Sequence, residues 1–267
     1  MMEKLPVEKP NYGNWISQKF IYVPGVISLA CLGLVFLHPV LAILSGVFLL
    51  IAAYFAYARY LFAPGGKNVQ EQIRTLVLAH LDWDGTGQAL DIGCGSAALT
   101  IELAKKYSKA SFTGIDNWGK GWEYSQRACE RNAQLEGVDQ RITFQLASAS
   151  RLPFTDESFD AVVSNLVFHE VADTADKRAL LREALRVVKK DGRFVFQDLF
   201  LIKQIYGKMD DLLETIRGWG IDQVEFIETR NSLFIPAALK LPFMVGTIGI
   251  LVGKKEKTED TPSHPIS

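Results

Sequence analysis

The sequence predicts an α/β fold, with a parallel β-sheet covered by helices, behind an apolar N-terminal region. Two observations carry this prediction. From about residue 69 to residue 197, short apolar segments alternate with segments of helical periodicity, and repeated strand–helix units of this kind give a parallel sheet. Residues 20–58 contain no Asp, Glu, Lys or Arg, which is typical of membrane-spanning segments.

Charge and cysteine content exclude several classes of partner. The 267 residues carry 29 Lys and Arg against 30 Asp and Glu. Because this balance leaves no surplus of positive charge to neutralise phosphates, nucleic acid is not an expected partner. The cysteines, Cys31, Cys94 and Cys129, lack the spacing of metal ligands, so no metal site is predicted, and they indicate reduced thiols in a cytosolic setting.

The apolar region divides into two segments, residues 20–37 and 39–58, which meet at His38 and Pro39. As helices these segments would measure roughly 27 and 30 Å, long enough to cross the core of a bilayer. Proline cannot continue a helix without the loss of a backbone hydrogen bond, so a tight turn is expected between them. We therefore predict two transmembrane helices that form a hairpin over residues 20–62, surrounded by membrane lipids.

Basic residues flank the hairpin and are missing from its connector; they are Lys4, Lys9, Lys19, Arg59 and Lys67. The positive-inside rule then predicts a two-pass membrane protein with both termini and the following domain in the cytoplasm. A buried helical pair in a soluble domain and a re-entrant pair in one leaflet stay open, because Pro24 and Gly25 weaken the first segment. A cleaved signal peptide fits poorly, since a second apolar run follows the first immediately.

The turn at residues 63–66 marks a domain boundary. We expect an N-terminal segment at residues 1–19, the hairpin at 20–62, a domain at 67–253 and a disordered polar tail at 254–267. Expected helices of the domain cover 69–81, 97–107, 124–136, 176–189 and 208–219, and expected strands cover 88–91, 110–115, 142–146, 159–164, 193–197, 223–229 and 246–253. No clear helix separates the last two strands, so this pair is more easily antiparallel.

A glycine turn follows the first expected strand. Gly93 and Gly95 stand where the strand turns into a helix, and their freedom lets a ligand approach the backbone. Asp116 ends the second expected strand, where a carboxylate can accept hydrogen bonds from both hydroxyls of a ribose. The glycine spacing also fits the G-x-G-x-x-G/A dinucleotide pattern, so a nicotinamide-dependent oxidoreductase is an alternative at this point.

Five segments of the domain form a more specific set. They are Leu90-Asp91-Ile92-Gly93-Cys94-Gly95, Gly114-Ile115-Asp116, residues 152–160, Val163-Ser164-Asn165 and residues 181–192. With them the sequence resembles the class I S-adenosylmethionine-dependent methyltransferases, and especially their small-molecule branch of quinone-biosynthesis C-methyltransferases. The resemblance implies a Rossmann-like, seven-stranded, mostly parallel sheet with its last strand antiparallel, and S-adenosyl-L-methionine as the cofactor.

The resemblance also implies which residues hold the cofactor. Asp91 would organise the loop near the methionine amino group, with Gly93, Cys94 and Gly95 close under the cofactor. Asp116 would hold the ribose, and Asn117 and Trp118 would lie beside the adenine. Asn165 would approach the methionine portion. For Trp118, packing beneath the loop is the alternative.

Two positions depart from the family pattern. Ala97 replaces the third glycine, a change that the loop should tolerate. Ser148 and Ala149 stand where many relatives carry Asp and Ala, and the aspartate of those relatives accepts from the adenine amino group. A neutral hydroxyl gives a weaker hydrogen bond than a carboxylate, so adenine recognition is expected to depend more on Trp118 and backbone groups.

The methyl acceptor is less defined by the sequence. His169 follows the fourth expected strand and is the candidate general base, since histidine titrates near neutral pH, although a structural histidine is the alternative. The hairpin and the apolar stretch at residues 233–244 favour a small hydrophobic acceptor such as a lipid or quinone. We thus expect a membrane-anchored methyltransferase; a membrane scaffold that binds the cofactor without catalysis is the alternative.

Overall fold

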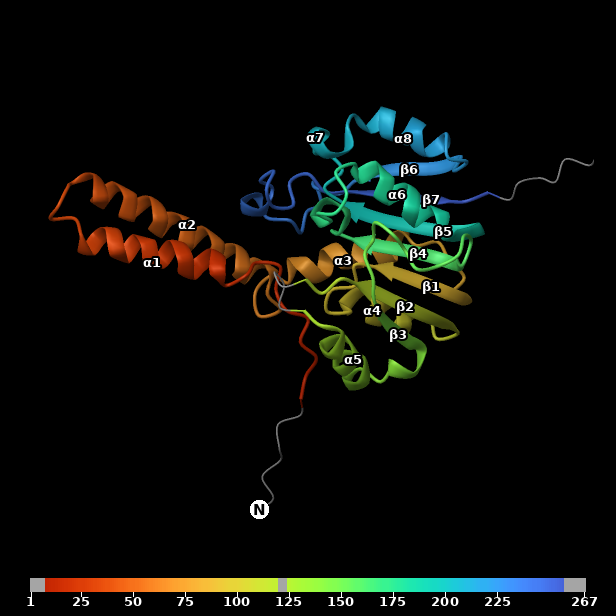
Figure 1. Cartoon of the computed structure of the whole chain (residues 1–267). Helices are drawn as coiled ribbons and strands as arrows, with labels where there is room; N and C mark the ends of the chain where they lie inside the picture. Colours follow the sequence, from red (N-terminus) through yellow and green to blue (C-terminus); the bar gives the residue numbers. More distant parts are fainter. Residues whose placement is uncertain (1–7, 120–123, 257–267) are drawn as a thin grey trace, which may run out of the picture. The chain divides into compact units, whose positions relative to one another are not determined.

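A computed structural model of the chain describes residues 8–119 and 124–256 (Figure 1). The chain forms two compact units. Among the described residues, the hairpin unit comprises residues 13–75 and 233–239, and the sheet unit comprises residues 8–12, 76–119, 124–232 and 240–256. The hairpin unit is therefore inserted into the chain of the sheet unit. The expected disordered tail begins too early: Lys254 lies in a strand, and the Lys255 N–H group donates to the Gly192 carbonyl at 3.0 Å. The rest of the tail, from residue 257 onward, lies outside the described residues, as do residues 1–7.

The sheet unit is built on seven strands in the order β3-β2-β1-β4-β5-β7-β6. Neighbours among β1 to β5 are parallel, whereas β7 runs antiparallel to both β5 and β6. The predicted mostly parallel sheet with its last strand antiparallel is confirmed. The strands are β1 (Gly87–Ile92), β2 (Ala110–Asp116), β3 (Ile142–Leu146), β4 (Phe159–Asn165), β5 (Val188–Asp198), β6 (Gln223–Glu228) and β7 (Gly249–Lys254).

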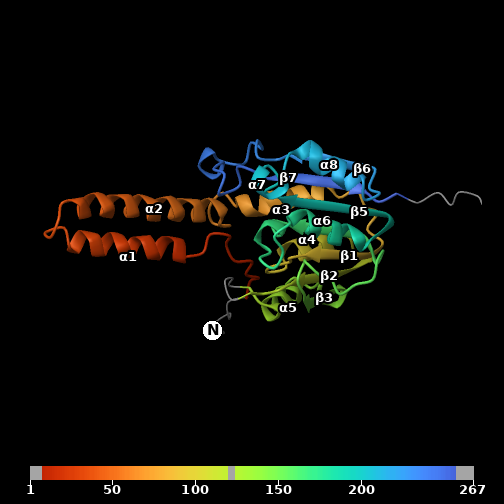
Figure 2. The same cartoon turned by 45° about the horizontal axis from the view of Figure 1, so that its top comes forward.

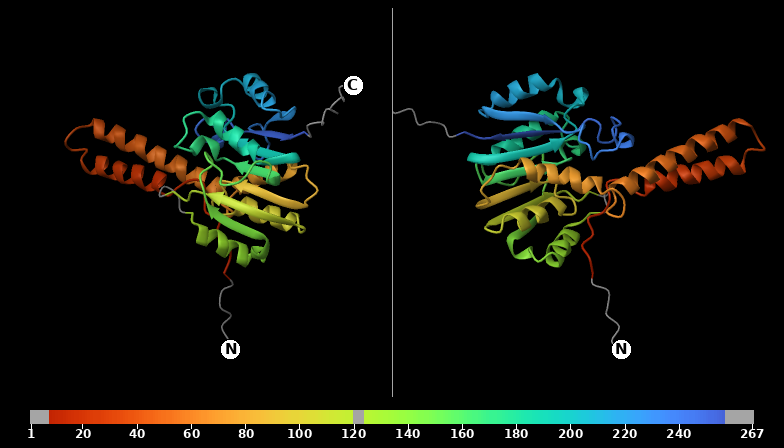
Figure 3. Two further views of the ribbon diagram at one scale, coloured as in Figure 1. Left: turned by 45° about the vertical axis from the view of Figure 1, so that its right-hand side comes forward. Right: turned by 180° about the vertical axis from the view of Figure 1, so that it is seen from behind.

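Helices cover both faces of this sheet (Figure 2, Figure 3). On one face, Leu181 and Leu185 pack with Phe194 and Phe196 in one apolar core. On the other face, a second core contains residues of α4 and α5 together with residues of the sheet. The helices that follow the hairpin are α3 (Val69–His80), α4 (Ala98–Lys106), α5 (Gln126–Leu135), α6 (Lys177–Arg186), α7 (Lys203–Tyr206) and α8 (Met209–Arg217), with short 3-10 helices η1 (Asp139–Arg141), η2 (Phe168–Glu170) and η3 (Ala237–Leu239).

The hairpin consists of α1 (Lys19–Gly33) and α2 (Val40–Phe62). Among the described residues, α2 is the one helix that is long and apolar enough to cross a membrane. The expectation of two spanning helices is corrected here: α1 ends at Gly33, and residues 34–37 are used in the turn that precedes Pro39. Its 15 residues would reach only about 22 Å.

The two hairpin helices bury polar side chains between them and expose apolar side chains on their outer surface. The Ser28 hydroxyl donates to the Ser45 carbonyl at 2.8 Å, and the Ser45 hydroxyl donates to the Ser28 carbonyl at 2.9 Å. Both serines are buried, whereas Leu29 and Leu50 are 70% and 72% exposed. Apolar side chains on the outside with hydrogen-bonded small polar residues inside are typical of helix pairs in lipid.

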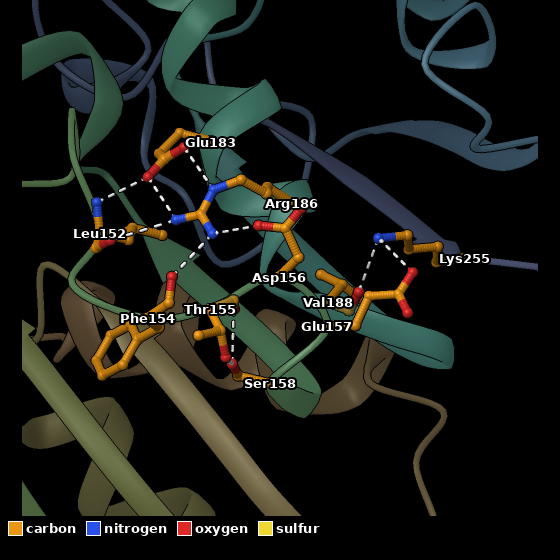
Figure 4. A network of polar contacts seen from close by, with 10 residues as sticks. All are labelled: Leu152, Phe154, Thr155, Asp156, Glu157, Ser158, Glu183, Arg186, Val188 and Lys255. Atoms are coloured by element: carbon orange, nitrogen blue, oxygen red, sulfur yellow. Dashed lines mark hydrogen bonds and ion pairs between the residues drawn. The ribbon is translucent and has the colours of Figure 1, made fainter.

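The segment at residues 152–160 is anchored by one arginine of α6 (Figure 4). The Arg186 guanidinium donates to the carbonyl groups of Leu152 and Phe154 and to the carboxylates of Asp156 and Glu183. The Glu183 carboxylate in turn accepts from the Leu152 N–H group at 2.8 Å. Arg186 and Glu183 thus hold this segment, which is part of the loop between β3 and β4, in a fixed conformation.

Strand β5 is longer than expected at its start. Residues 188–192, which precede the strand expected at 193–197, belong to the strand, and the register with β4 shifts between Phe159 and Ala161. Asp191 takes a positive φ of 63° in this irregular stretch. These residues therefore form a bulge within a continuous strand.

Candidate functional site

The glycine turn after β1 is held against the neighbouring strand. The N–H groups of Gly93 and Cys94 both donate to the Ile115 carbonyl of β2, at 2.8 and 2.9 Å. Gly93 has φ of +73°, and a Cβ atom added there would overlap the side chain of Val167. Both the backbone conformation and the space therefore require glycine at position 93.

Ala97 adopts a backbone conformation that favours glycine. Its φ is +67°, which is left-handed, and it precedes α4 as the N-terminal cap residue. A left-handed alanine costs about 1 kcal/mol relative to a right-handed one. The loop tolerates the change, as the sequence suggested, but with backbone strain.

Asp116 closes the turn from the end of β2. Its two carboxylate oxygens accept from the N–H groups of Gly95 at 2.9 Å and Trp118 at 2.7 Å. Each oxygen keeps a lone pair for a further donor, and the residue is only partly buried. A pair of hydroxyl groups could therefore bind here, as the ribose prediction requires.

The indole of Trp118 packs against the same turn. Its Nε1–H group donates to the Gly95 carbonyl at 3.0 Å. This is the arrangement of the alternative in which Trp118 lies beneath the loop, and its contact with adenine stays a prediction. Asn117 is exposed, and its side-chain oxygen accepts from the N–H group of Gly119 at 3.1 Å.

Asp91 lies beneath the turn and is almost fully buried. The hydroxyl of Thr100 donates to its carboxylate at 2.6 Å. Burial raises the pKa of Asp91 to about 7, and the negative charge of Asp116 contributes, so this group changes charge near neutral pH. The Cys94 thiol is buried as well, so this residue can present only backbone groups to a ligand.

Two residues with amide side chains, Asn165 and Gln197, are register partners near the ends of β4 and β5. Among the buried side-chain atoms of the described residues, Asn165 Oδ1 and both amide atoms of Gln197 have no hydrogen-bond partner. A buried polar atom without a partner is costly, so a polar ligand at this edge would satisfy an existing need. Asn165 was predicted to contact the cofactor; Gln197 was not assigned to the site.

Ser148 and Ala149 lie in the loop after β3. The Ala147 N–H group donates to the Asp116 carbonyl at 3.0 Å, so this loop begins beside the end of β2. The hydroxyls of Ser148 and Ser150 both lie within hydrogen-bond distance of Asp173, at 2.9 and 2.7 Å from its Oδ2 atom. A carboxylate is therefore present beside the position at which the sequence lacks one.

His169 is held by a buried carboxylate at the end of β5. Its Nδ1 atom lies 2.7 Å from Asp198 Oδ1, and Asp198 also accepts from the N–H groups of Val167, Phe168 and Leu199. Burial lowers the pKa of His169, but Asp198 and Glu170 raise it, to about 10 as the net result. The expectation that His169 titrates near neutral pH is thus wrong for this arrangement; a catalytic role for His169 stays a prediction.

The predicted residues come together as one site. Asp91, the glycine turn and Asp116 lie at the ends of β1 and β2, and Ser148, Asn165 and His169 follow β3 and β4 at the same edge, where ligands bind in open α/β sheets. The open lone pairs of Asp116 and the unpaired Asn165 oxygen fit a nucleoside with an amino acid tail. No group of three or more metal-ligating side chains comes together in the described parts of the chain.

Comparison with known proteins agrees with this geometry. Residues 90–196 match the model of the family described as "Methyltransferase domain". The chain therefore contains a class I S-adenosylmethionine-dependent methyltransferase domain. This decides between the two interpretations of the glycine turn, because a dinucleotide-dependent oxidoreductase would not carry this domain.

The methyltransferase domain has relatives among characterised proteins. The chain is 33% identical over 156 residues to 27-O-demethylrifamycin SV methyltransferase of Amycolatopsis mediterranei, covering 57% of this chain and 53% of the relative. It is 31% identical over 125 residues to a ubiquinone/menaquinone biosynthesis C-methyltransferase of Desulfotalea psychrophila, covering 47% and 46%. The chain thus spans about half the length of these relatives.

A solved structure shares the fold of the methyltransferase domain. Geranyl diphosphate C-methyltransferase from Streptomyces coelicolor A3(2), in complex with Mg2+, geranyl diphosphate and S-adenosyl-L-homocysteine, superposes with a TM-score of 0.54. The match covers 71% of this chain and 80% of that one at 14% identity. At this identity the likeness supports the fold and not the substrate.

Proposed function

We propose that the protein is a membrane-anchored S-adenosylmethionine-dependent methyltransferase that acts on a small, lipophilic acceptor. The observation that carries the proposal is the union, in one chain, of the polar site at the sheet edge with a hairpin whose apolar side chains are exposed. When bound, the cofactor supplies an electrophilic methyl group. The chain then has to bind the acceptor, orient it and keep water away.

In this proposal, each cofactor-binding residue has a distinct task. Asp116 accepts hydrogen bonds from the ribose hydroxyls through its remaining lone pairs. Asp91, once ionised, stabilises the ammonium group of the methionine portion. Asn165 accepts a hydrogen bond with its otherwise unpaired Oδ1 atom. Gly93 lets the Val167 side chain pack against the backbone of the turn, and so it fixes the shape of the loop that would hold the cofactor.

His169 is proposed to position the acceptor. Its Nδ1–H group is committed to Asp198, and its Nε2 atom lies 3.4 Å from Glu170. With a pKa of about 10 the ring is protonated at neutral pH, so it can donate a hydrogen bond to an oxygen of the acceptor. A general-base role would need the neutral ring, which this ion pair disfavours.

Membrane anchoring is proposed from the hairpin unit. Helix α2 is long enough to span the bilayer core, and α1 would insert beside it without crossing alone. The apolar segment at residues 233–239 belongs to the same unit: the Tyr54 hydroxyl of α2 donates to the Ala238 carbonyl at 2.9 Å, and Leu233 is fully exposed. Both termini and the methyltransferase domain are proposed to face the cytoplasm.

A lipophilic acceptor follows from this placement. An enzyme held at a bilayer meets substrates that partition into the same phase at a high local concentration. A sequence relative of the domain is named for ubiquinone/menaquinone biosynthesis, which supports a lipophilic acceptor without fixing its identity.

The test is incubation of the purified full chain with isotope-labelled S-adenosylmethionine and native membrane lipids. We expect label in an organic-extractable product whose mass has increased by one methylene unit. Label recovered in water-soluble products alone would contradict the lipophilic acceptor. Cofactor binding without any labelled product would favour the scaffold alternative.

A further inference from the structure

A small polar cluster beside the proposed cofactor site has no assigned role. It comprises Ser148 and Ser150 of the loop after β3 and Asp173 of the loop after β4. Asp173 Oδ2 lies 2.9 Å from Ser148 Oγ and 2.7 Å from Ser150 Oγ, and the two hydroxyl oxygens lie 2.8 Å apart. The Ser150 N–H group also donates to Ser148 Oγ at 3.2 Å.

The cluster is rich in acceptors. The two hydroxyls supply only two hydrogens for the three close oxygen–oxygen contacts, so one contact must lack a hydrogen. The second oxygen of Asp173 has one weak contact, with Thr174 at 3.5 Å. The hydrogen bonds from Ser150 and Ser148 lower the pKa of Asp173, so the carboxylate is ionised at neutral pH. The cluster can therefore accept a hydrogen bond from an N–H donor of a ligand.

The cluster lies near the end of β2, where the ribose of the cofactor is proposed to bind. Leu146, the last residue of β3, is the register partner of Asp116, and Ser148 lies two residues beyond it. A nucleoside whose ribose binds Asp116 therefore has its base within reach of the loop at Ser148. Asp173 itself is exposed, so a ligand can approach it.

We infer that Asp173, aligned by Ser148 and Ser150, recognises the exocyclic amino group of the cofactor's adenine. This inference rests on the proposed binding of S-adenosylmethionine. Position 148 has no carboxylate, and in this inference Asp173, which lies 25 residues further along the chain in another loop, supplies one instead. Adenine recognition then depends on the contact between the loop after β3 and the loop after β4.

The test compares two ligands on the full-length protein by titration calorimetry. One is S-adenosylhomocysteine, and the other is the same thioether with unsubstituted purine in place of adenine, which lacks the amino group. We expect the wild-type protein to bind the adenine compound about tenfold more tightly, as one charge-assisted hydrogen bond would give. Asp173→Asn should lose about this factor for the adenine compound and little for the purine compound.

Two further variants make the test specific. Asp176→Asn is the matched control, because Asp176 caps α6 in the same loop and asparagine is an equally good cap. It should leave both affinities unchanged. Ser148→Asp alone should weaken binding, since it sets two carboxylates side by side, whereas Ser148→Asp combined with Asp173→Ser should restore the preference for adenine.

The outcomes separate this inference from the proposed function. If the wild-type protein binds both compounds equally, or if Asp173→Asn weakens both equally, the amino-group contact is refuted while cofactor binding stands. If the wild-type protein binds neither compound, the proposed function fails, and this inference fails with it.

Discussion

The sheet edge and the hairpin treat polar groups in opposite ways. At the sheet edge, carboxylates of different strands collect backbone donors: Asp116 accepts from two N–H groups and Asp198 from three. In the hairpin, the hydroxyls of Ser28 and Ser45 each donate to the backbone carbonyl of the other serine, and the outer surface is apolar. The sheet edge is therefore organised to receive a polar ligand, whereas the hairpin needs none.

The largest effect is expected from Asp198→Ala. This change leaves the N–H groups of Val167 and Phe168 and the His169 ring without their common acceptor. Removal of one partner of a buried charged network costs roughly 3–5 kcal/mol. We expect the free energy of unfolding in urea to fall by this amount. Asp222→Ala, an exposed control, should change it by less than about 0.5 kcal/mol. Equal effects would mean that the buried network contributes no stability.

Gly93→Ala tests the turn. The substitution combines a positive φ with overlap onto Val167 and should cost about 2–4 kcal/mol, with loss of cofactor binding. Gly137→Ala is the matched control, because Gly137 has φ of +68° but open space around its Cα atom. It should cost only about 1 kcal/mol and leave binding intact. Thermal unfolding and calorimetry measure both; similar costs would show that the contact with Val167 does not matter.

Leu50→Arg tests the other region. On an insertion scale, arginine near the middle of a spanning helix costs about 2.5–3.5 kcal/mol. We expect a smaller fraction of the protein to remain with membranes after carbonate extraction. Gln145→Lys, a new charge on the exposed part of β3, should leave that fraction unchanged. Full retention of Leu50→Arg would contradict burial of this face in lipid.

Asp91 predicts a pH dependence of cofactor affinity. Its raised pKa of about 7 keeps the carboxyl group protonated below neutral pH, and only the ionised form can pair with an ammonium group. Affinity should therefore fall about tenfold per pH unit below pH 7. The free energy of unfolding of the ligand-free protein should move the other way, because the folded state binds the proton more tightly. A pH-independent affinity, or the same slope in Asp91→Asn, would refute this assignment.

The smallest effect concerns the two serines of the hairpin. Ser28→Ala should weaken the helix pair by about 0.6 kcal/mol, the average for such contacts in membranes, and speed amide exchange in α1 about threefold. Because the two hydroxyls are coupled, Ser45→Ala in the same chain should add less than its separate effect. Fully additive effects, measured by hydrogen–deuterium exchange in membranes, would show that the serines act independently.

Much of the sheet could be predicted from the sequence, because strands and helices have their own periodicity. The strands at residues 110–116 and 142–146 agree with the expected bounds within one residue. The glycine turn with Asp91 and Asp116 was found because its spacing is local. The length of α1 was not, since a continuous apolar run does not reveal where the chain needs residues for a turn.

The rest of the site depends on contacts between distant segments. Asp198 anchors His169 from 29 residues away, and Asp173 meets Ser148 across two loops. Nothing in the local pattern around position 198 distinguishes a carboxylate that organises a loop from one that binds a ligand. The raised pKa of His169 could not be predicted for the same reason, because its partner Asp198 ends another strand.

The N-terminal segment has a consequence for how the protein can be shortened. Asn132 of α5 donates to the carbonyls of Asn11 and Ser96, and the Ser96 hydroxyl donates to the Tyr12 carbonyl at 2.9 Å. The glycine turn is thus braced by residues that precede the hairpin. A shortened protein that starts after residue 66 would lose this brace, whereas one that keeps residues 11 and 12 would retain it.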